Sequence, residues 1–115
     1  MSECIHRNFQ FLKNLNSCSG YKRKKILKTC TKDNINALTE VAHNVLKGNV
    51  TIDSEDKKAI KRHRDKVRNL AKKRVSFKKK RQQLTQKGGF LPRLLRPTLK
   101  FLAAVGASAV ANSIF

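Results

Sequence analysis

Positive charge is the feature that most restricts how this 115-residue chain can fold. Between Lys57 and Lys87 there are fifteen lysines and arginines and one acid, Asp65. The whole chain has 27 lysines and arginines against 7 acids, which gives a formal net charge of +20. Cations at this density repel one another and destabilise a compact monomer unless a polyanion screens them. We therefore expect one small domain with arms, and a partner that is a nucleic acid or an anionic membrane surface.

Charge also divides the chain into four parts, which form three expected domains. Residues 1–30 are basic, with most of their cations in the run "YKRKK" at 21–25. Residues 31–56 reverse the sign and, together with the basic residues 57–87, form an expected helical module over 31–87. Residues 88–115 are mostly apolar and are interrupted by Gly88-Gly89 and two prolines. This pattern predicts a flexible basic arm, a helical hairpin and a hydrophobic tail.

The basic arm contains one short amphipathic pattern. Ile5, Phe9 and Leu12 follow the i, i+4, i+7 spacing of a helix face, and the cluster "SCSG" at 17–20 would end that helix. A disordered arm fits the same residues equally well. The run "YKRKK" would add to phosphate binding or act as a nuclear import signal.

The first helix of the hairpin has clear boundaries. Thr31 or Asp33 can accept hydrogen bonds from the amides of its first turn, and Gly48 follows as a left-handed stop. Its apolar residues share one face, so this face should be buried. They are Ile35, Leu38, Ala42 and Val45, widened by Val41 and Leu46.

The second helix is expected to be one long basic rod. It would begin after a cap at Asp53 or Ser54 and run to about Gln86, roughly 50 Å at about 1.5 Å per residue. Its sparse apolar residues recur at heptad spacing and predict packing along one edge only, or a seam for dimerisation. They are Ile60, Val67, Leu70, Phe77 and Leu84.

The cations of this rod and of "YKRKK" are the predicted phosphate contacts. Lysine predominates, and lysine acts as a point charge, which suits sequence-independent binding to a nucleic-acid backbone. DNA is the favoured polymer, although charge alone does not separate it from RNA. The predicted nucleic-acid-binding residues are Lys22, Arg23, Lys24, Lys25, Lys57, Lys58, Lys61, Arg62, Arg64, Lys66, Arg68, Lys72, Lys73, Arg74, Lys78, Lys79, Lys80 and Arg81.

The tail has three open interpretations. Pro92 and Pro97 lack an amide hydrogen and argue against a regular helix there, whereas Thr98–Phe115 favours a final apolar helix. The uncharged stretch from Phe101 is shorter than the ~20 residues of a membrane span. Three interpretations fit better than a span: contact with a partner protein, contact with a bilayer surface, and burial in the chain's own core. The predicted contact residues are Phe90, Leu91, Leu94, Leu95, Leu99, Phe101, Leu102 and Val105.

Catalytic and metal chemistry find little support in the sequence. The acids lie mostly at expected helix starts, where capping explains them. Cys4, Cys18 and Cys30 are odd in number and widely spaced, and with His6 they match no compact zinc spacing. We expect no enzyme activity, no cofactor and no metal. Reduced thiols and a start without an apolar run indicate an intracellular protein without a signal peptide.

The stretch "KGGFLPRLLRPTLKFLAAVGASAVANSIF" resembles the C-terminal end of the adenovirus core protein X precursor, the parent of the small DNA-condensing mu peptide. The shared elements are a basic run, Gly88-Gly89, Phe90, Leu91-Pro92, a Leu/Pro-rich run and an Ala/Gly-rich end. The middle of the chain also resembles small basic proteins of adintoviruses and Maverick/Polinton elements. Together these resemblances cover about residues 40–115.

This resemblance implies a virion core protein that packages a DNA genome and enters the host nucleus. It also implies cleavage by a viral cysteine protease at Gly88-Gly89, before Phe90. That protease favours a large apolar residue at the position where this chain has Gln86, and the short core peptide has no counterpart of the acidic section 31–56. We thus expect an all-α, non-enzymatic protein that binds and condenses DNA without sequence preference. The alternative is a membrane-active or membrane-anchored capsid accessory protein that acts through its apolar tail, with a capsid protein or a membrane as partner.

Overall fold

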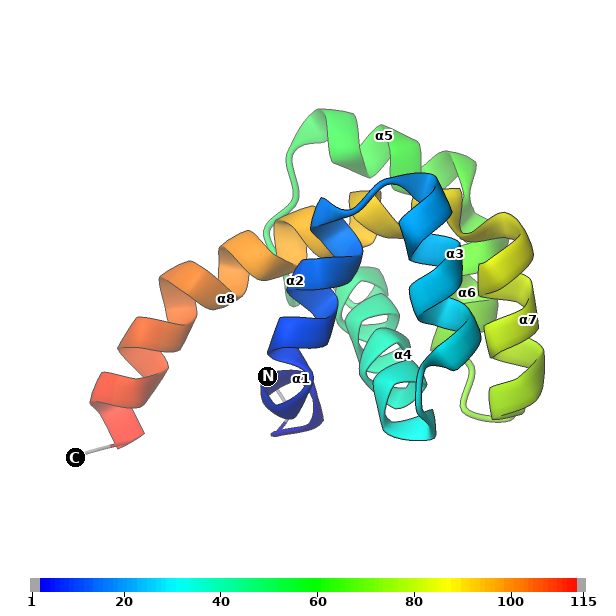
Figure 1. Ribbon diagram of the computed structural model, residues 1–115. Helices are drawn as coiled ribbons and strands as arrows, with labels where there is room; N and C mark the ends of the chain where they lie inside the picture. Colours follow the sequence, from blue (N-terminus) through cyan, green and yellow to red (C-terminus); the bar gives the residue numbers. More distant parts are fainter. Residues whose placement is uncertain (1–2, 114–115) are drawn as a thin grey trace.

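A computed structural model describes the backbone from Glu3 to Ser113 and the side chains from Glu3 to Ala104. Within these limits the regular secondary structure is helical, which confirms the expected all-α class (Figure 1). The radius of gyration is 13.7 Å, close to the roughly 13 Å expected for a compact domain of about 100 residues. The helices are α1 (Glu3–Arg7), α2 (Phe9–Ser17), α3 (Gly20–Thr29), α4 (Lys32–Leu46), α5 (Ser54–Arg62), α6 (Arg64–Ala71), α7 (Phe77–Lys87), the 3₁₀ turn η1 (Gly88–Phe90) and α8 (Leu91–Ser113).

Helix α4 lies at the centre and confirms the expected first helix of the module. Thr31 Oγ1 accepts from the Asn34 amide, and Asn34 Oδ1 accepts from the Thr31 amide, so the two residues form a reciprocal cap. Gly48 follows with a φ of 76°, a conformation that glycine adopts without steric cost. The predicted apolar face is buried except for Leu46, which is 41% exposed. Helices α1, α6, α7 and α8 pack around α4.

The first thirty residues are part of this packed structure, so the expectation of a flexible arm is wrong. Ile5, Leu12 and Leu15 are fully buried, as the amphipathic spacing in this segment requires. A third helix, α3, follows the cluster at 17–20, where the Ser19 hydroxyl accepts from the Lys22 amide. Leu27 of α3 is also buried and anchors this basic helix to the core.

A polar cluster fixes α1 against the start of α4. Arg7 Nη2 donates to Asp33 Oδ1 at 2.9 Å, and Asn8 Nδ2 donates to Asp33 Oδ2 at 2.9 Å. Asn8 Oδ1 also accepts from Asn34 Nδ2 at 2.6 Å. These donors, Arg7 first, lower the pKa of the Asp33 carboxyl below its usual range. Asp33 therefore has a structural role at the junction of these two helices.

The expected long rod over 54–86 is also wrong, because the chain breaks twice. The first break is at His63, whose ring stacks on Phe90 with centroids 6.1 Å apart. The second is the loop 72–76, after which the Ser76 hydroxyl accepts from the Lys79 amide and starts α7. These breaks let α6 pack on α4 and let α7 pack on α3. A straight rod would have kept its apolar stripe on one edge, whereas the folded segments bury Ile60, Val67, Leu70 and Leu84 in the shared core.

Helix α8 continues through both prolines, contrary to the expectation from their missing amides. Pro92 lies in the first turn, where amide hydrogens have no helical partner. Pro97 lies inside the helix and removes one hydrogen bond, while Leu94 and Leu102 on either side are buried and hold the helix in place. The Thr98 hydroxyl donates to the Leu94 carbonyl at 2.8 Å, so this buried polar group is satisfied.

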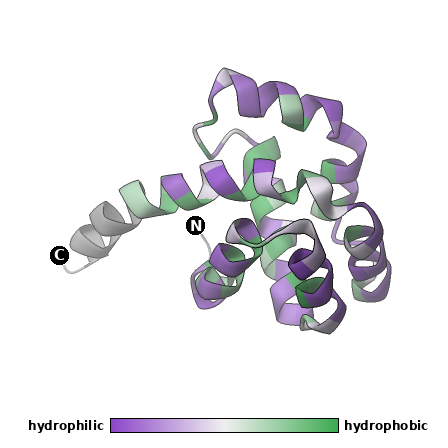
Figure 2. Cartoon of the chain, turned by 45° about the horizontal axis from the view of Figure 1, so that its top comes forward, coloured by the Kyte–Doolittle hydropathy of each residue, from purple (hydrophilic) through white to green (hydrophobic). Residues whose placement is uncertain are grey.

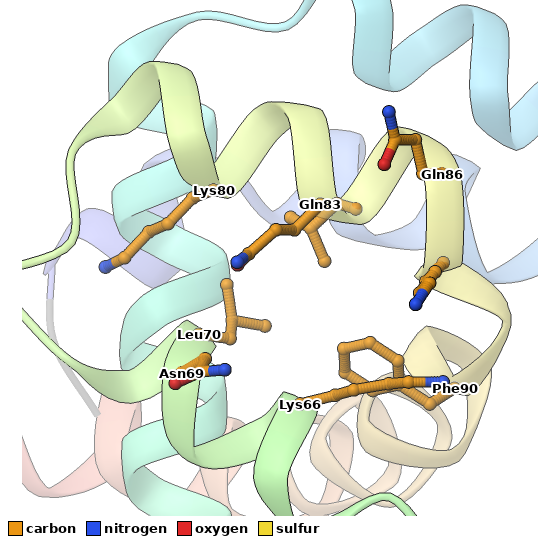
Figure 3. Close-up of a pocket in the computed structure, with 9 residues that line it drawn as sticks. Lys66, Asn69, Leu70, Lys80, Gln83, Gln86 and Phe90 are labelled. Carbon is orange, nitrogen blue, oxygen red and sulfur yellow. The ribbon is translucent and has the colours of Figure 1, made fainter.

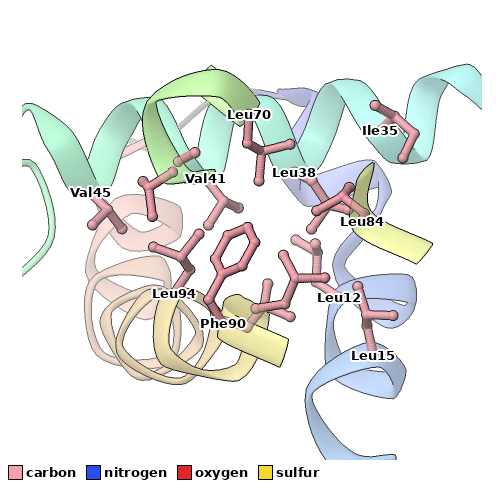
Figure 4. Packing of buried hydrophobic residues seen from close by; sticks show 14 of the residues in the cluster. Leu12, Leu15, Ile35, Leu38, Val41, Val45, Leu70, Leu84, Phe90 and Leu94 are labelled. Carbon is pink, nitrogen blue, oxygen red and sulfur yellow. The ribbon is translucent and has the colours of Figure 1, made fainter. Parts of the chain in front are cut away.

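The hydrophobic core draws on helices from α1 to α8, between Ile5 and Leu102 (Figure 4). Leu12 from the N-terminal segment, Leu38 and Val41 from α4, Leu84 from α7 and Leu94 from α8 belong to one cluster. Helix α8 crosses this cluster beneath α5 and then passes α2 (Figure 1). The core is therefore larger than the charge of the chain led us to expect.

Candidate nucleic-acid interface

Two basic helices that are distant in the sequence lie side by side. Helix α3 runs antiparallel to α7 and packs against it (Figure 1). Neither helix contains an acidic residue. We call their cations the α3–α7 face: Lys22, Arg23, Lys24, Lys25 and Lys28 on α3, and Lys78, Lys79, Lys80, Arg81 and Lys87 on α7.

The contact between α3 and α7 concentrates charge along their length. Lys28, near the end of α3, lines a shallow hollow together with Lys78 and Arg81 from the first half of α7. Arg81 lies over the Phe77 ring, 5.0 Å from its centroid, in a cation–π contact that holds the guanidinium near the surface. Apart from Lys80, the cations of the face are exposed or half-buried, so they are available to a polyanion. Figure 2 shows the hydrophilic character of these helices.

Lys80 is the exception on the α3–α7 face. Its side chain points from α7 toward α4, and Nζ donates to Thr39 Oγ1 at 2.8 Å (Figure 3). The residue is only 5% exposed, and burial lowers the pKa of its ammonium below the usual range. Lys80 borders the hollow between α6 and α7, where Leu70 and Phe90 form apolar walls. The structure thus removes Lys80 from the set of predicted phosphate contacts that face solvent.

Replacing Lys80 with methionine should stabilise the protein at neutral pH. A lowered pKa means that the fold disfavours the charged ammonium, so Lys80 costs stability below its folded pKa. That cost disappears as pH rises from the folded pKa toward the unfolded value of about 10.4. We expect a higher urea midpoint for Lys80→Met than for wild type at pH 7, and a smaller difference near pH 10. Lys79→Met removes the same charge from an exposed position and should leave the midpoint nearly unchanged. A midpoint for Lys80→Met below that of Lys79→Met at pH 7 would contradict this prediction.

The other predicted phosphate contacts lie on α5, α6 and the loop that follows α6. They are exposed, and several of them surround a hollow at the junction of α5 and α6 near His63. Asp65 lies in the same hollow and Glu55 in the first turn of α5, so this surface is less purely basic than the α3–α7 face. The residues concerned are Lys57, Lys58, Lys61, Arg62, Arg64, Lys66, Arg68, Lys72, Lys73 and Arg74. The breaks at His63 and at 72–76 thus divide the predicted row of cations between two surfaces.

Most of the predicted membrane or partner contacts are inside the protein. Phe90, Leu91, Leu94, Leu95 and Leu102 are buried in the core, which is the third of the interpretations left open for the tail. Leu99 and Phe101 are half-buried. Val105 lies in α8, but its side chain is outside the described residues. In the part of the chain that the structure describes, no helix is both long enough and apolar enough to span a bilayer.

The predicted processing site lies in a structured turn. Gly88, Gly89 and Phe90 form η1, and Phe90 is 5% exposed. A Cβ atom at Gly88 would meet Leu27 and Leu91 methyl groups at 3.6 and 3.5 Å, which shows how closely this turn packs. A protease would therefore have to act on a locally opened form of this segment. Cleavage stays a prediction of the sequence.

The cysteines do not gather into a site. Cys4, Cys18 and Cys30 are free thiols on separate parts of the fold, and burial raises the pKa of the Cys4 and Cys30 thiols. Among the described residues, histidine, cysteine and acidic side chains form no group of three that could hold a metal ion.

Sequence reasoning missed three residues of this interface, which are Lys28, Lys87 and Tyr21. Lys28 was left out of the predicted contacts, although a helix over 20–29 places it one turn beyond Lys24 and Lys25. Tyr21 is 70% exposed, and Lys25 Nζ lies 4.7 Å from its ring centroid. Reading the run "YKRKK" as a helix would have put Tyr21 and Lys25 on one face, since they are four residues apart.

Comparison of the chain with models of protein families, with curated proteins and with solved structures finds no match. The fold and its charged surfaces therefore carry the functional argument.

Proposed function

We propose that this protein binds and condenses DNA without sequence preference and has no enzymatic activity. The observation that carries the proposal is the α3–α7 face: two antiparallel helices with ten lysines and arginines and no acid. Apart from the buried Lys80, the cations of this face are exposed or half-buried, and neither helix carries an acid beside them. A surface of this kind attracts a polyanion and releases the counterions condensed on it.

The dimensions of the face match a nucleic-acid backbone. Helix α7 has 11 residues and is about 16 Å long at about 1.5 Å per residue. Duplex DNA presents about nine phosphates over that length, of which roughly half lie toward one side. The exposed cations of α5 and α6 would supply further contacts on a second surface. Two basic surfaces on one small protein can bridge neighbouring duplexes, which is what condensation requires.

Lysines dominate both surfaces, and this supports recognition of the backbone over recognition of bases. Phosphate contacts fix a protein on its nucleic acid without reading sequence. The resemblance to small viral core proteins gives the proposal its biological setting, a virion core assembled with its genome in the host nucleus. DNA is the polymer we propose, and RNA is the alternative that the experiment tests.

A salt titration tests this function directly. We expect the full-length protein to bind a labelled 20-base-pair DNA of arbitrary sequence, measured by fluorescence anisotropy. If about six to eight phosphates are contacted, the log–log slope of affinity against salt should be about −5 to −7. Affinity should then fall by about 10³- to 10⁴-fold between 50 and 200 mM NaCl. A second DNA of unrelated sequence should give the same curve, and an RNA duplex shows whether DNA is preferred. Absence of binding at 50 mM NaCl, or a slope near zero, would refute the proposal.

A further inference from the structure

A second hollow lies at one end of the α3–α7 face, between the start of α3 and the end of α7. Its volume is about 420 Å³, and it continues onto the turn η1. Leu27 and Leu84, both buried, form its apolar part. The lining residues that would contact a ligand are Gly20, Tyr21, Arg23, Gln86, Gly88 and Gly89.

Arg23 in this lining has an unsatisfied donor. Its Nε atom is buried, and no acceptor of the described protein residues lies within hydrogen-bonding distance of it. Buried polar atoms are nearly always hydrogen-bonded, so this donor lacks a partner inside the fold. Arg23 as a whole is only half-buried, so a turn of its side chain can present the guanidinium to an acceptor in the hollow. The guanidinium fork matches the oxygens of a phosphate better than any other cationic side chain does. Arg23 is therefore placed to hold one phosphate group.

Tyr21 supplies a flat apolar surface beside this cation. Tyr21 is 70% exposed, more than any other large hydrophobic residue whose side chain the structure describes. Lys25 lies against the ring at 4.7 Å, which keeps a second cation close by. Exposed aromatic rings next to basic residues are the platforms on which unpaired bases stack in single-strand-binding proteins. Paired bases inside a duplex stack on one another and do not offer their faces to such a ring.

The rest of the hollow leaves room for a base. Gly89 has no side chain, and a Cβ atom built on it would meet nothing within 4 Å. Gln86 also lines the hollow, and its amide can both donate to and accept from the edge of a base.

We propose that this hollow binds one unpaired nucleotide, with its base on Tyr21 and its phosphate on Arg23. The inference builds on the proposed function, because a nucleic acid that binds the α3–α7 face through its phosphates would lie next to the hollow. It adds a preference for single-stranded segments or strand ends that charge alone does not produce. The ligand is a nucleotide whose base is unpaired, and either DNA or RNA can supply it.

Tyr21 is itself the reporter for this site, since the chain has one tyrosine and no tryptophan. We expect single-stranded dT12 and rU12 to quench the tyrosine emission strongly at 50 mM NaCl, and a 12-base-pair duplex to quench it weakly at the same saturation. The two single strands separate DNA from RNA as the source of the nucleotide. For a reporter outside the hollow, Tyr21→Phe combined with Leu46→Tyr moves the tyrosine to an exposed position at the end of α4. Its emission should respond little to either strand.

Substitutions then separate stacking from charge. By anisotropy with labelled dT12, Tyr21→Leu should weaken binding by about tenfold or more, whereas Tyr21→Phe keeps the ring and should bind like wild type. Arg23→Lys keeps the charge but loses the fork, and should weaken dT12 binding more than duplex binding. Tyr21 is exposed, and circular dichroism should show the same helix content in both of its variants.

Two results would overturn the inference while leaving the proposed function intact. One is equal quenching by duplex and single strand, and the other is an unchanged dT12 affinity in Tyr21→Leu, each with steep salt dependence of duplex binding. If neither duplex nor single strand binds at 50 mM NaCl, the proposed function itself fails.

Discussion

Neutralising four lysines of the α3–α7 face should reduce DNA affinity by up to about 10³-fold at 100 mM salt. Each phosphate contact contributes about 0.9 to the log–log salt slope, so the loss of four contacts should make the slope less negative by about 3.6. The variant replaces Lys22, Lys28, Lys78 and Lys79 with glutamine, all of them exposed. The measurement is anisotropy of a labelled 20-base-pair duplex across a salt series.

The matched control removes the same amount of charge from other surfaces. Lys13, Lys47, Arg96 and Lys100 are exposed and lie on α2, after α4 and on α8. Replacing these four with glutamine also lowers the net charge by four, from +20 to +16. This control should lose less than about tenfold in affinity and keep most of its salt slope. Equal losses in the two variants would mean that binding depends on the overall charge and that the α3–α7 face is not the site.

Truncating Leu94 should destabilise the fold by about 2–5 kcal/mol, which is the range for leucine-to-alanine changes in packed cores. Leu94 is fully buried within the core cluster, so Leu94→Ala removes apolar contacts and leaves a cavity. Single domains of this size have about 5–15 kcal/mol of stability, and the change would remove a large part of it. Urea unfolding followed by circular dichroism gives the value.

Leu46→Ala is the control for this truncation. Leu46 lies at the end of α4 and is 41% exposed, so the same chemical change should alter the free energy of unfolding by no more than about 0.5 kcal/mol. The comparison separates the two interpretations of the apolar tail. If α8 serves the core, Leu94→Ala is costly. If α8 is held outside the core for a membrane or a partner, both substitutions should cost equally little.

The parts of the fold that could be predicted from the sequence depend on neighbouring residues. Helix α4 has a cap at Thr31, an apolar face at helical spacing and a glycine stop at Gly48, and the structure contains all three. The cap at Asp53 is also present, where Oδ1 accepts from the Asp56 amide at 2.8 Å. Caps, turns and amphipathic faces involve residues within a few positions of one another, so their signals are readable along the chain.

The errors came from runs of charge, which carry little information about where a helix ends. The cations from Lys57 to Lys87 read as one continuous rod, but the helix breaks at His63, whose ring stacks on Phe90, and at the loop before Ser76. The "YKRKK" run read as an arm, although Leu27 just beyond it is fully buried and draws α3 into the core. In both places a contact with a distant residue decided the local structure.

Composition and periodicity thus determined that the chain is helical, that it carries a large excess of cations and that α4 forms where it does. The tertiary structure decided which cations act together. It joined α3 to α7 across the 47 residues between them, turned Lys80 inward to Thr39, and placed Tyr21 and Arg23 beside the end of α7. The physical reason is that helix pairing follows the burial of apolar side chains such as Leu27 and Leu84, which are far apart in the chain. The charged side chains are positioned by the helices that this burial brings together.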